Sequence, residues 1–277
     1  MACEECQSRD EPSGTVCDSR PCAVEHLAAG RRAVEIPGMR PFLTAEWREL
    51  AMLNWAVPPD LLRAHVPAGT ELDAWDGTTY VSVVGFRFLR TRVLRVPVPL
   101  HRNFEEVNLR FYVRRRDGTA WRRGVVFIRE LVPRRAIAWT ARLAYNEPYR
   151  ALPMRHVIDR AGDGVPTTVR YEWRRAGAWE GLGVRVEGEA RAIADGSEAE
   201  FITEHYWGYT RQRDGSTIEY RVEHPRWHAW PARSAWLRCD VRSLYGPAFA
   251  EALAGEPRSA FLADGSAVTV YRPTPIA

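Results

Sequence analysis

Short apolar runs separated by turn-forming dipeptides dominate the chain from about residue 40 onward. Strand-like segments rich in β-branched and aromatic residues lie at 79–84, 111–113, 125–128, 168–171, 217–222 and 268–271. The dipeptide Asp-Gly occurs at 76–77, 117–118, 163–164, 195–196, 214–215 and 264–265. Tight hairpin turns need positive φ angles, which glycine favours and aspartate tolerates, so these dipeptides predict β-hairpins. The pattern therefore predicts a mainly β (β-rich α+β) protein with antiparallel strands.

Helical signals are few and short. Short helices are predicted at residues 61–65, 197–204 and 248–254. The clearest start is Ser197, because Glu200 three residues later completes a capping box. Residues 136–144 carry apolar side chains at helical spacing, but Trp139 and Thr140 suit a strand equally well. Helices are thus expected to be minor additions to a β framework.

Four of the five cysteines lie near the N-terminus, as Cys3-x2-Cys6 and Cys17-x4-Cys22. Two such pairs can supply four thiolates to tetrahedral zinc, which keeps a zinc site open as an alternative. The residues between the pairs offer no strand or knuckle pattern, so residues 1–38 are predicted to be a disordered leader or to follow from a mis-assigned start. Residues 39–277 lack a linker and are predicted to form a single β-rich domain.

All 39 basic side chains of the Lys and Arg class are arginines. Without lysine the chain has no side-chain amine for a Schiff base and no P-loop lysine. No apolar run approaches the length of a membrane span, and the N-terminus lacks a signal-peptide pattern. The sequence therefore predicts a cytoplasmic protein with no membrane partner.

Arginines outnumber acids between Arg87 and Arg150. Such a stripe can hold nucleic acid, with Trp121, Trp139 and Tyr149 as stacking platforms. No recognised nucleic-acid motif accompanies it, and solvated strand faces explain the arginines equally well. We expect no nucleic-acid partner.

The segment 104–113 carries the most informative alternation in the chain. In a strand, Glu106, Asn108, Arg110 and Tyr112 share one face, and the apolar residues between them share the other. The simplest interpretation is a half-exposed strand with its polar face in water. Inside the mouth of a barrel, however, a carboxylate, an amide, a guanidinium and a phenol can fix a small polar ligand.

Together with other short motifs, this segment resembles the YqjF-like family of conserved bacterial proteins. The likeness runs from about residue 40 to 273. Its other motifs are Trp55-x-Val57, the stretch 69–77 before a strand ending Gly85-Phe86-Arg87, Glu204-His205-Tyr206, and His224-Pro225-x-Trp227. The resemblance implies an acetoacetate-decarboxylase-like fold, an antiparallel β-barrel or cone with a few short helices around a small-molecule pocket.

One departure from the decarboxylases bears on chemistry. Those enzymes form a Schiff base through a buried lysine in a Pro-Lys-Lys segment, and the comparable stretch here is Glu147-Pro148-Tyr149-Arg150. The resemblance also implies that Glu106 takes the place of a glutamate on a barrel strand. Amine-catalysed decarboxylation is therefore excluded, but a pocket for a carbonyl or carboxylate group remains.

Further candidate ligand-binding residues follow from the same motifs: Tyr149, Arg150, His205, Tyr206, His224 and Trp227. The alternatives are structural, since His205 can stabilise helix C-terminal carbonyls and Trp227 can belong to the core. No His-x-His or His-Glu-x-x-His spacing, dinucleotide loop or P-loop is present, so no metal and no cofactor are expected.

Two hypotheses for function remain. In the first, the protein binds a small anionic or carbonyl-bearing molecule without catalysis, and Glu106 and Arg110 form a structural ion pair. In the second, it is a lysine-independent enzyme of lyase or hydrolase type, in which Glu106 transfers a proton, Arg110 orients the substrate, and Asn108 or Tyr112 supports the oxyanion. A cavity-facing Glu106 with a raised pKa favours catalysis, and a closed ion pair favours structure. The oligomeric state stays open.

Overall fold

The computed structural model describes residues 40–97, 101–134 and 146–276, which belong to one compact unit. The predicted leader 1–38 with its cysteines and the segment 136–144 lie outside the described residues. The mainly β prediction is confirmed. Strands dominate the described chain, and its helices are short.

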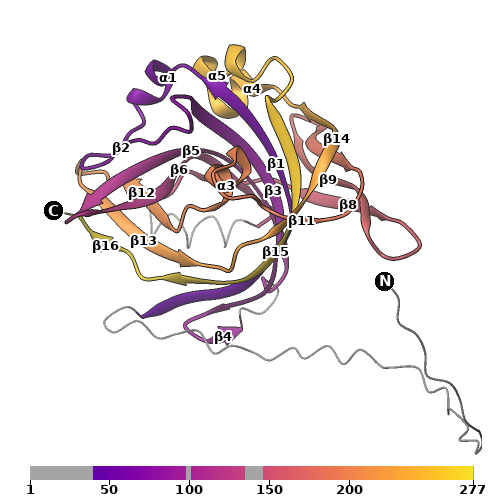
Figure 1. The fold of residues 1–277 in the computed structure, drawn as a ribbon, viewed down its shortest axis with the longest axis horizontal. Coiled ribbons are helices and arrows are strands. Elements are labelled where there is room, and N and C mark those ends of the chain that lie inside the picture. Colours follow the sequence, from indigo (N-terminus) through magenta and orange to yellow (C-terminus); the bar gives the residue numbers. More distant parts are fainter. Residues whose placement is uncertain (1–39, 98–100, 135–145, 277) are drawn as a thin grey trace, which may run out of the picture. The chain divides into compact units, whose positions relative to one another are not determined.

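Seven strands form a closed ring (Figure 1). In ring order they are β13 (Thr217–Glu223), β12 (Trp207–Arg211), β6 (Ala120–Val132), β5 (Phe104–Asp117), β3 (Thr79–Val93), β1 (Pro41–Val57) and β15 (Ser259–Tyr271). The ring closes because β13 pairs with β15 through Val222↔Val270 and Glu223↔Thr269. All of these pairs are antiparallel except β12 with β6, which is parallel. The predicted barrel is thus present, with one parallel junction.

A second group of strands continues from β15. Its order is β14 (His228–Arg238), β10 (Ala178–Val186), β9 (Pro166–Arg175) and β8 (Met154–Arg160). Tyr171 and Trp173 of β9 are fully buried against the outward face of the ring strands, in one core with Leu109 and Phe111 of β5. The ring is therefore buried on both faces, which explains the long runs of buried residues in β1, β3 and β5.

The remaining elements are short. The minor strands are β2 (Glu71–Leu72), β4 (Val96–Pro97), β7 (Tyr149–Ala151), β11 (Arg191–Ala192) and β16 (Thr274–Pro275). The helices are α1 (Pro59–Arg63), α3 (Glu198–Thr203), α4 (Val241–Tyr245) and α5 (Pro247–Ala252). Ser197 caps α3 as predicted, because its side chain accepts a hydrogen bond from the Glu200 amide at 3.1 Å.

Four of the six Asp-Gly dipeptides lie in turns between neighbouring strand residues. They are 76–77, 117–118, 163–164 and 214–215. The hairpin prediction is wrong for the other two. Asp195-Gly196 precedes α3, where the Gly196 amide donates to the Glu200 carboxylate at 2.6 Å. Asp264-Gly265 lies inside β15 at a close approach to β1, where a Cβ on Gly265 would stand 2.1 Å from the Trp47 carbonyl oxygen.

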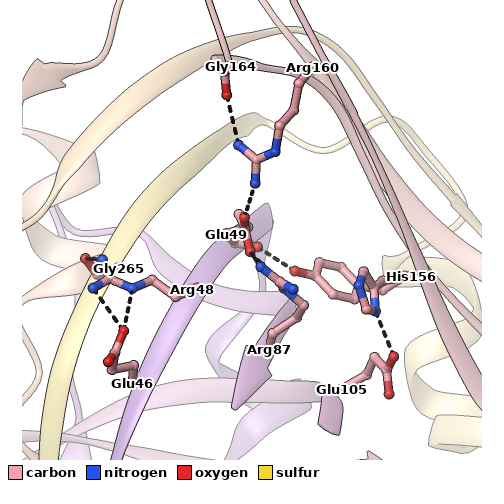
Figure 2. Close-up of polar contacts among 10 residues, drawn as sticks. Glu46, Arg48, Glu49, Arg87, Glu105, His156, Arg160, Gly164 and Gly265 are labelled. Atoms are coloured by element: carbon pink, nitrogen blue, oxygen red, sulfur yellow. Dashed lines mark hydrogen bonds and ion pairs between the residues drawn. The ribbon is translucent and has the colours of Figure 1, made fainter. Parts of the chain in front are cut away.

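A bulge in β1 anchors the ring to the second group of strands (Figure 2). Glu49, at the bulge, has a positive φ of 52° and a buried carboxylate. Arg87 of β3 donates to this carboxylate at 2.7 Å, and Arg160 of β8 binds it from the opposite side. The Tyr171 hydroxyl donates to the Glu49 carbonyl oxygen at 2.8 Å. Through Glu49, the bulge therefore joins β1 to three other strands, β3, β8 and β9.

Candidate functional site

A cavity of about 260 Å³ lies against the inward face of the ring. Six of the seven ring strands contribute lining side chains, β12 being the exception among the described residues. Most of the wall is apolar and aromatic, with Trp47, Phe86 and Phe88 in edge or tilted ring contacts. Polar groups gather on the part of the wall formed by β5, β6 and β7. This mixture is typical of a small-molecule pocket.

Strand β5 places three of its four predicted polar residues in the cavity wall. Glu106, Asn108 and Arg110 all line it, as alternation predicts. Tyr112 shares their face but is not among the lining residues, because the rings of Phe201 and His205 pack against it at 5.1 and 4.7 Å. Its hydroxyl is within 2.6 Å of the Ser82 hydroxyl. Of the two residues proposed to support an oxyanion, Asn108 lines the cavity and Tyr112 does not.

Three buried carboxyl groups line the same cavity: Glu106, Glu130 of β6 and Glu147. Burial, together with the nearby Glu147, raises the pKa of Glu106 to about 8. Burial likewise raises the pKa of Glu147 to about 7 and that of Glu130 well above its ordinary value. Carboxyl groups that lose water and repel one another hold protons at neutral pH. Around pH 7, Glu106 and Glu130 are therefore mainly protonated, and Glu147 is about half protonated.

Hydrogen bonds satisfy this cluster only in part. The Asn108 amide donates to Glu106 Oε1 at 3.2 Å, and the Tyr149 hydroxyl lies 3.3 Å from Glu106 Oε2. The Tyr220 hydroxyl binds Glu147. Glu130 Oε2 and Asn108 Oδ1 are buried without a hydrogen-bond partner among the described residues. Buried polar groups are rarely left unpaired, so these atoms mark a place where a bound molecule or water completes the pairing.

Arg110 is the only arginine among the described residues that line the cavity. Its terminal nitrogen donates to the Ile202 carbonyl at 3.1 Å, and its Nε has no hydrogen-bond partner in the described chain. No ion pair joins it to Glu106 within the described ranges. The closed Glu106–Arg110 pair of the first hypothesis is therefore absent, and the guanidinium retains donor capacity.

The other predicted site residues divide into two groups. Tyr149, His205, His224 and Trp227 line the cavity, whereas Arg150 and Tyr206 do not. Arg150 follows Tyr149 along β7, and alternation turns successive side chains to opposite faces. The His224 ring lies between Trp227, at 4.2 Å, and Tyr206, at 4.9 Å. Tyr206 thus packs against the His224 ring without lining the cavity itself.

Sequence reasoning missed Glu130 and Glu147. Strict alternation places Glu130 opposite to Phe127, but Leu109 pairs with Arg129 and Arg110 with Phe127, so Ile128 is an extra residue in β6. Because of this bulge, Glu130 and Phe127 both face the cavity. A glutamate flanked by buried Leu131 and Val132 was the available signal. Glu147 lies outside the regular strands, where no alternation indicates which way a side chain faces.

No group of three His, Cys, Asp or Glu residues suited to a metal ion occurs among the described residues. Within the same ranges, every helix is too short or too polar to span a membrane.

Solved structures with this architecture define the class of the fold. An acetoacetate decarboxylase from Legionella pneumophila superposes with a TM-score of 0.59 at 13% identity, covering 95% of this chain and 98% of that one. The enduracididine biosynthesis enzyme MppR, in complex with pyruvate, gives 0.61 at 13% identity, covering 90% and 95%. An acetoacetate-decarboxylase-like enzyme from Sphingomonas wittichii RW1 gives 0.57 at 16% identity, covering 86% and 94%. The fold is therefore acetoacetate-decarboxylase-like.

The family follows from the sequence comparisons. The model of the DUF2071 family, described as an uncharacterised conserved protein, matches residues 44–267, and the chain belongs to this family. The uncharacterised protein YqjF of Bacillus subtilis (strain 168) is 25% identical over 215 residues, covering 77% of this chain and 84% of that protein. The resemblance to YqjF-like proteins is thereby confirmed.

Proposed function

We propose that the cavity binds a small anionic or carbonyl-bearing molecule whose polar head is held by Arg110. The observation that carries this proposal is the unpartnered Nε of Arg110 in a cavity whose Glu106 and Glu130 are mainly protonated near pH 7. Protonated carboxyl groups do not repel an anion, and a guanidinium with a free N–H binds carboxylate and carbonyl oxygens. The aromatic wall suits the apolar remainder of such a molecule.

The pyruvate bound by MppR, a protein of the same fold, supports this ligand class. Pyruvate carries both a carboxylate and a carbonyl group. The identity between the two chains is too low to carry over residues or reactions, so the support is limited to the kind of molecule that such a cavity accommodates.

A catalytic role is the second candidate, and the environment of Glu106 favours it. Burial raises its pKa to about 8, so near neutral pH it can both donate and accept a proton. Asn108 and Tyr149 fix both of its oxygens. In a lysine-independent reaction of lyase type, Glu106 would exchange a proton with the carbon next to a carbonyl, while Arg110 orients the substrate and Asn108 supports the developing oxyanion.

Ligand binding is tested with the intact protein and two variants. Small molecules that co-purify are identified by mass spectrometry, and a panel of short carboxylates and 2-oxo acids is titrated by calorimetry. We expect Arg110→Gln to weaken binding at least about tenfold. Arg233→Gln, which alters an exposed arginine on β14, serves as the matched control and should bind as the wild type does. Equal affinities in all three proteins would contradict the proposal.

Catalysis is tested by proton exchange, which requires no knowledge of the product. The bound 2-oxo acid is incubated with the protein in D₂O, and the loss of the protons next to the carbonyl is followed by NMR. We expect Glu106→Gln to bind the acid but to lose the exchange. Binding without exchange in the wild type would leave the binding function and remove the catalytic one.

A further inference from the structure

His205 connects the cavity to a charged pair behind its wall. The side chain is almost fully buried, at 1% exposure, and lines the cavity together with Arg110 and Thr203. Its Nε2 lies 3.4 Å from Asp73 Oδ2, and Asp73 is outside the cavity lining. This contact replaces the helix C-terminal carbonyls that the sequence suggested as the partner of His205.

Asp73 is held in place and stays ionised. Arg123 Nε donates to its Oδ2 at 2.7 Å, and the Ala74 amide donates to its Oδ1 at 3.0 Å. Although burial acts in the opposite direction, the hydrogen bonds from His205 and Arg123 lower the pKa of Asp73 to about 2. A carboxylate is an acceptor only, so the contact with His205 requires a proton on Nε2.

His205 itself is neutral. Burial lowers its pKa to about 4. The hydrogen bond and charge of Asp73 act in the opposite direction, and the positive charge of Arg123 offsets part of that effect. A neutral imidazole carries a single ring proton, and with that proton on Nε2 the Nδ1 atom is a bare acceptor. Nδ1 is buried without a hydrogen-bond partner among the described residues. The rings of Tyr112 and Phe201, at 4.7 and 5.2 Å, hold the imidazole in this orientation.

We infer that His205 is a specificity-determining hydrogen-bond acceptor of the cavity, that Asp73 is the positioning residue that sets its tautomer, and that the ligand is a hydroxy- or amino-substituted carboxylate or carbonyl compound. This inference rests on the proposed binding function, in which Arg110 holds the carboxylate or carbonyl group. The neighbouring O–H or N–H of the ligand then donates to Nδ1. A site with a buried acceptor discriminates against analogues that lack the donor, because the acceptor is then left unpaired.

The tautomer is measured without any ligand. Long-range ¹H–¹⁵N correlation spectra of protein labelled in its 7 histidines report which ring nitrogen carries the proton, and His205→Phe assigns the signal. We expect the Nε2–H form in the wild type. Asp73→Asn should reduce its population, and Asp73→Glu should restore it. A protonated Nδ1 or an imidazolium at His205 in the wild type near pH 7 would overturn the inference.

Specificity is measured with matched acid pairs, such as 2-hydroxybutanoate against butanoate. We expect the hydroxy acid to bind the wild type roughly tenfold more tightly. The preference, measured as the ratio of the two affinities within each variant, should vanish in His205→Phe and Asp73→Asn, provided that thermal unfolding shows both variants folded. Equal affinity of the two acids in the wild type would overturn the inference. If neither acid binds, the proposed binding function fails, whereas loss of both only in Arg110→Gln would support it.

Discussion

Glu106 shows how a single buried side chain couples folding to pH. Its oxygens contact an amide and a phenol, and no arginine or histidine pairs with it in the described chain. The neutral form is therefore the form that the folded protein accommodates. A group with this property makes stability depend on pH in the direction opposite to that of an ordinary carboxylate in a salt bridge.

We expect stability to fall as pH rises. Burial raises the pKa of Glu106 to about 8 and that of Glu147 to about 7, from an ordinary value of 4.5. Between about pH 4.5 and pH 8, the folded state thus binds more protons than the unfolded state. The contribution of these protonated carboxyl groups to stability is complete below about pH 4.5 and is lost as pH rises through about 7 and 8. Glu106→Gln should be more stable than the wild type by about 3 kcal/mol near pH 8.5.

The control for this experiment is Glu251→Gln, which changes an exposed glutamate on α5. Urea unfolding of the three proteins between about pH 5 and 9 provides the measurement. The control should match the wild type throughout. A pH slope that Glu106→Gln leaves unchanged would show that Glu106 is ionised in the folded protein.

The lack of lysine has a direct chemical consequence. Borohydride traps an imine, and an imine requires an amine, which no side chain of this protein supplies. We expect no covalent adduct on any internal residue after borohydride treatment with pyruvate or acetoacetate, as checked by peptide mass spectrometry. An adduct within residues 40–276 would contradict this expectation.

The candidate site could be predicted from sequence only where the strand was regular. Alternation along β5 identified Glu106, Asn108 and Arg110 correctly as residues of one face. It failed for Glu130, because the bulge beside Arg110 adds a residue to one strand and reverses the facing of the residues beyond it. Asp73 could not be found at all, since it reaches His205 across 132 positions of chain.

At the level of strands, two irregularities lie opposite each other where β1 pairs with β15. Glu49 has a positive φ in β1, and Gly265 has a φ of 78° in β15, beside its partner Arg48. Arg48 also donates to the Gly265 carbonyl at 3.1 Å. The backbones approach so closely here that a side chain on residue 265 has no room.

Gly265→Ala should therefore destabilise the protein by about 3 kcal/mol. The new Cβ would stand 2.1 Å from the Trp47 carbonyl oxygen, and alanine is strained at a φ of 78°. Gly215→Ala separates the two effects, because Gly215 has a φ of 88° with open space around it and should cost only about 1 kcal/mol. Thermal or urea unfolding measures both, and equal losses would show that steric contact at Gly265 is unimportant.

Turn chemistry explains which elements were predictable. Asp117-Gly118 and Asp214-Gly215 connect adjacent strands as expected. The turn between β9 and β10 was missed because it uses Ala176-Gly177, with φ values of 48° and 86°. Leu94-Arg95, which connects β3 to β4, has positive φ at two residues that carry side chains. The local sequence does not favour such a turn, so the pairing of the flanking strands must determine it.

At the level of the whole molecule, the described unit has cores on both faces of the ring that are built from its own strands and helices. We expect deletion of residues 1–38 to shift the melting temperature by less than about 2 °C, because these core contacts are retained. Calorimetry of the two proteins, with metal analysis of each, provides the test. A larger drop, or stoichiometric zinc lost on deletion, would show that the N-terminal cysteines form a structural site.

The β12–β13 hairpin is the most weakly paired part of the closed ring. The hairpin of β12 and β13 pairs with β6 through Trp207↔Gly124 and Gly208↔Val125 and with β15 through two further pairs, while the short strand β16 adds two pairs along β13. Tyr220 of this hairpin lines the cavity. A ligand too wide for the closed ring can enter only if this hairpin separates from its neighbours, because the hydrogen bonds between ring strands fix their spacing. We expect the amides of the β12–β13 hairpin to exchange with deuterium faster than those of β1 and β3. Their exchange should become slower when a ligand occupies the cavity.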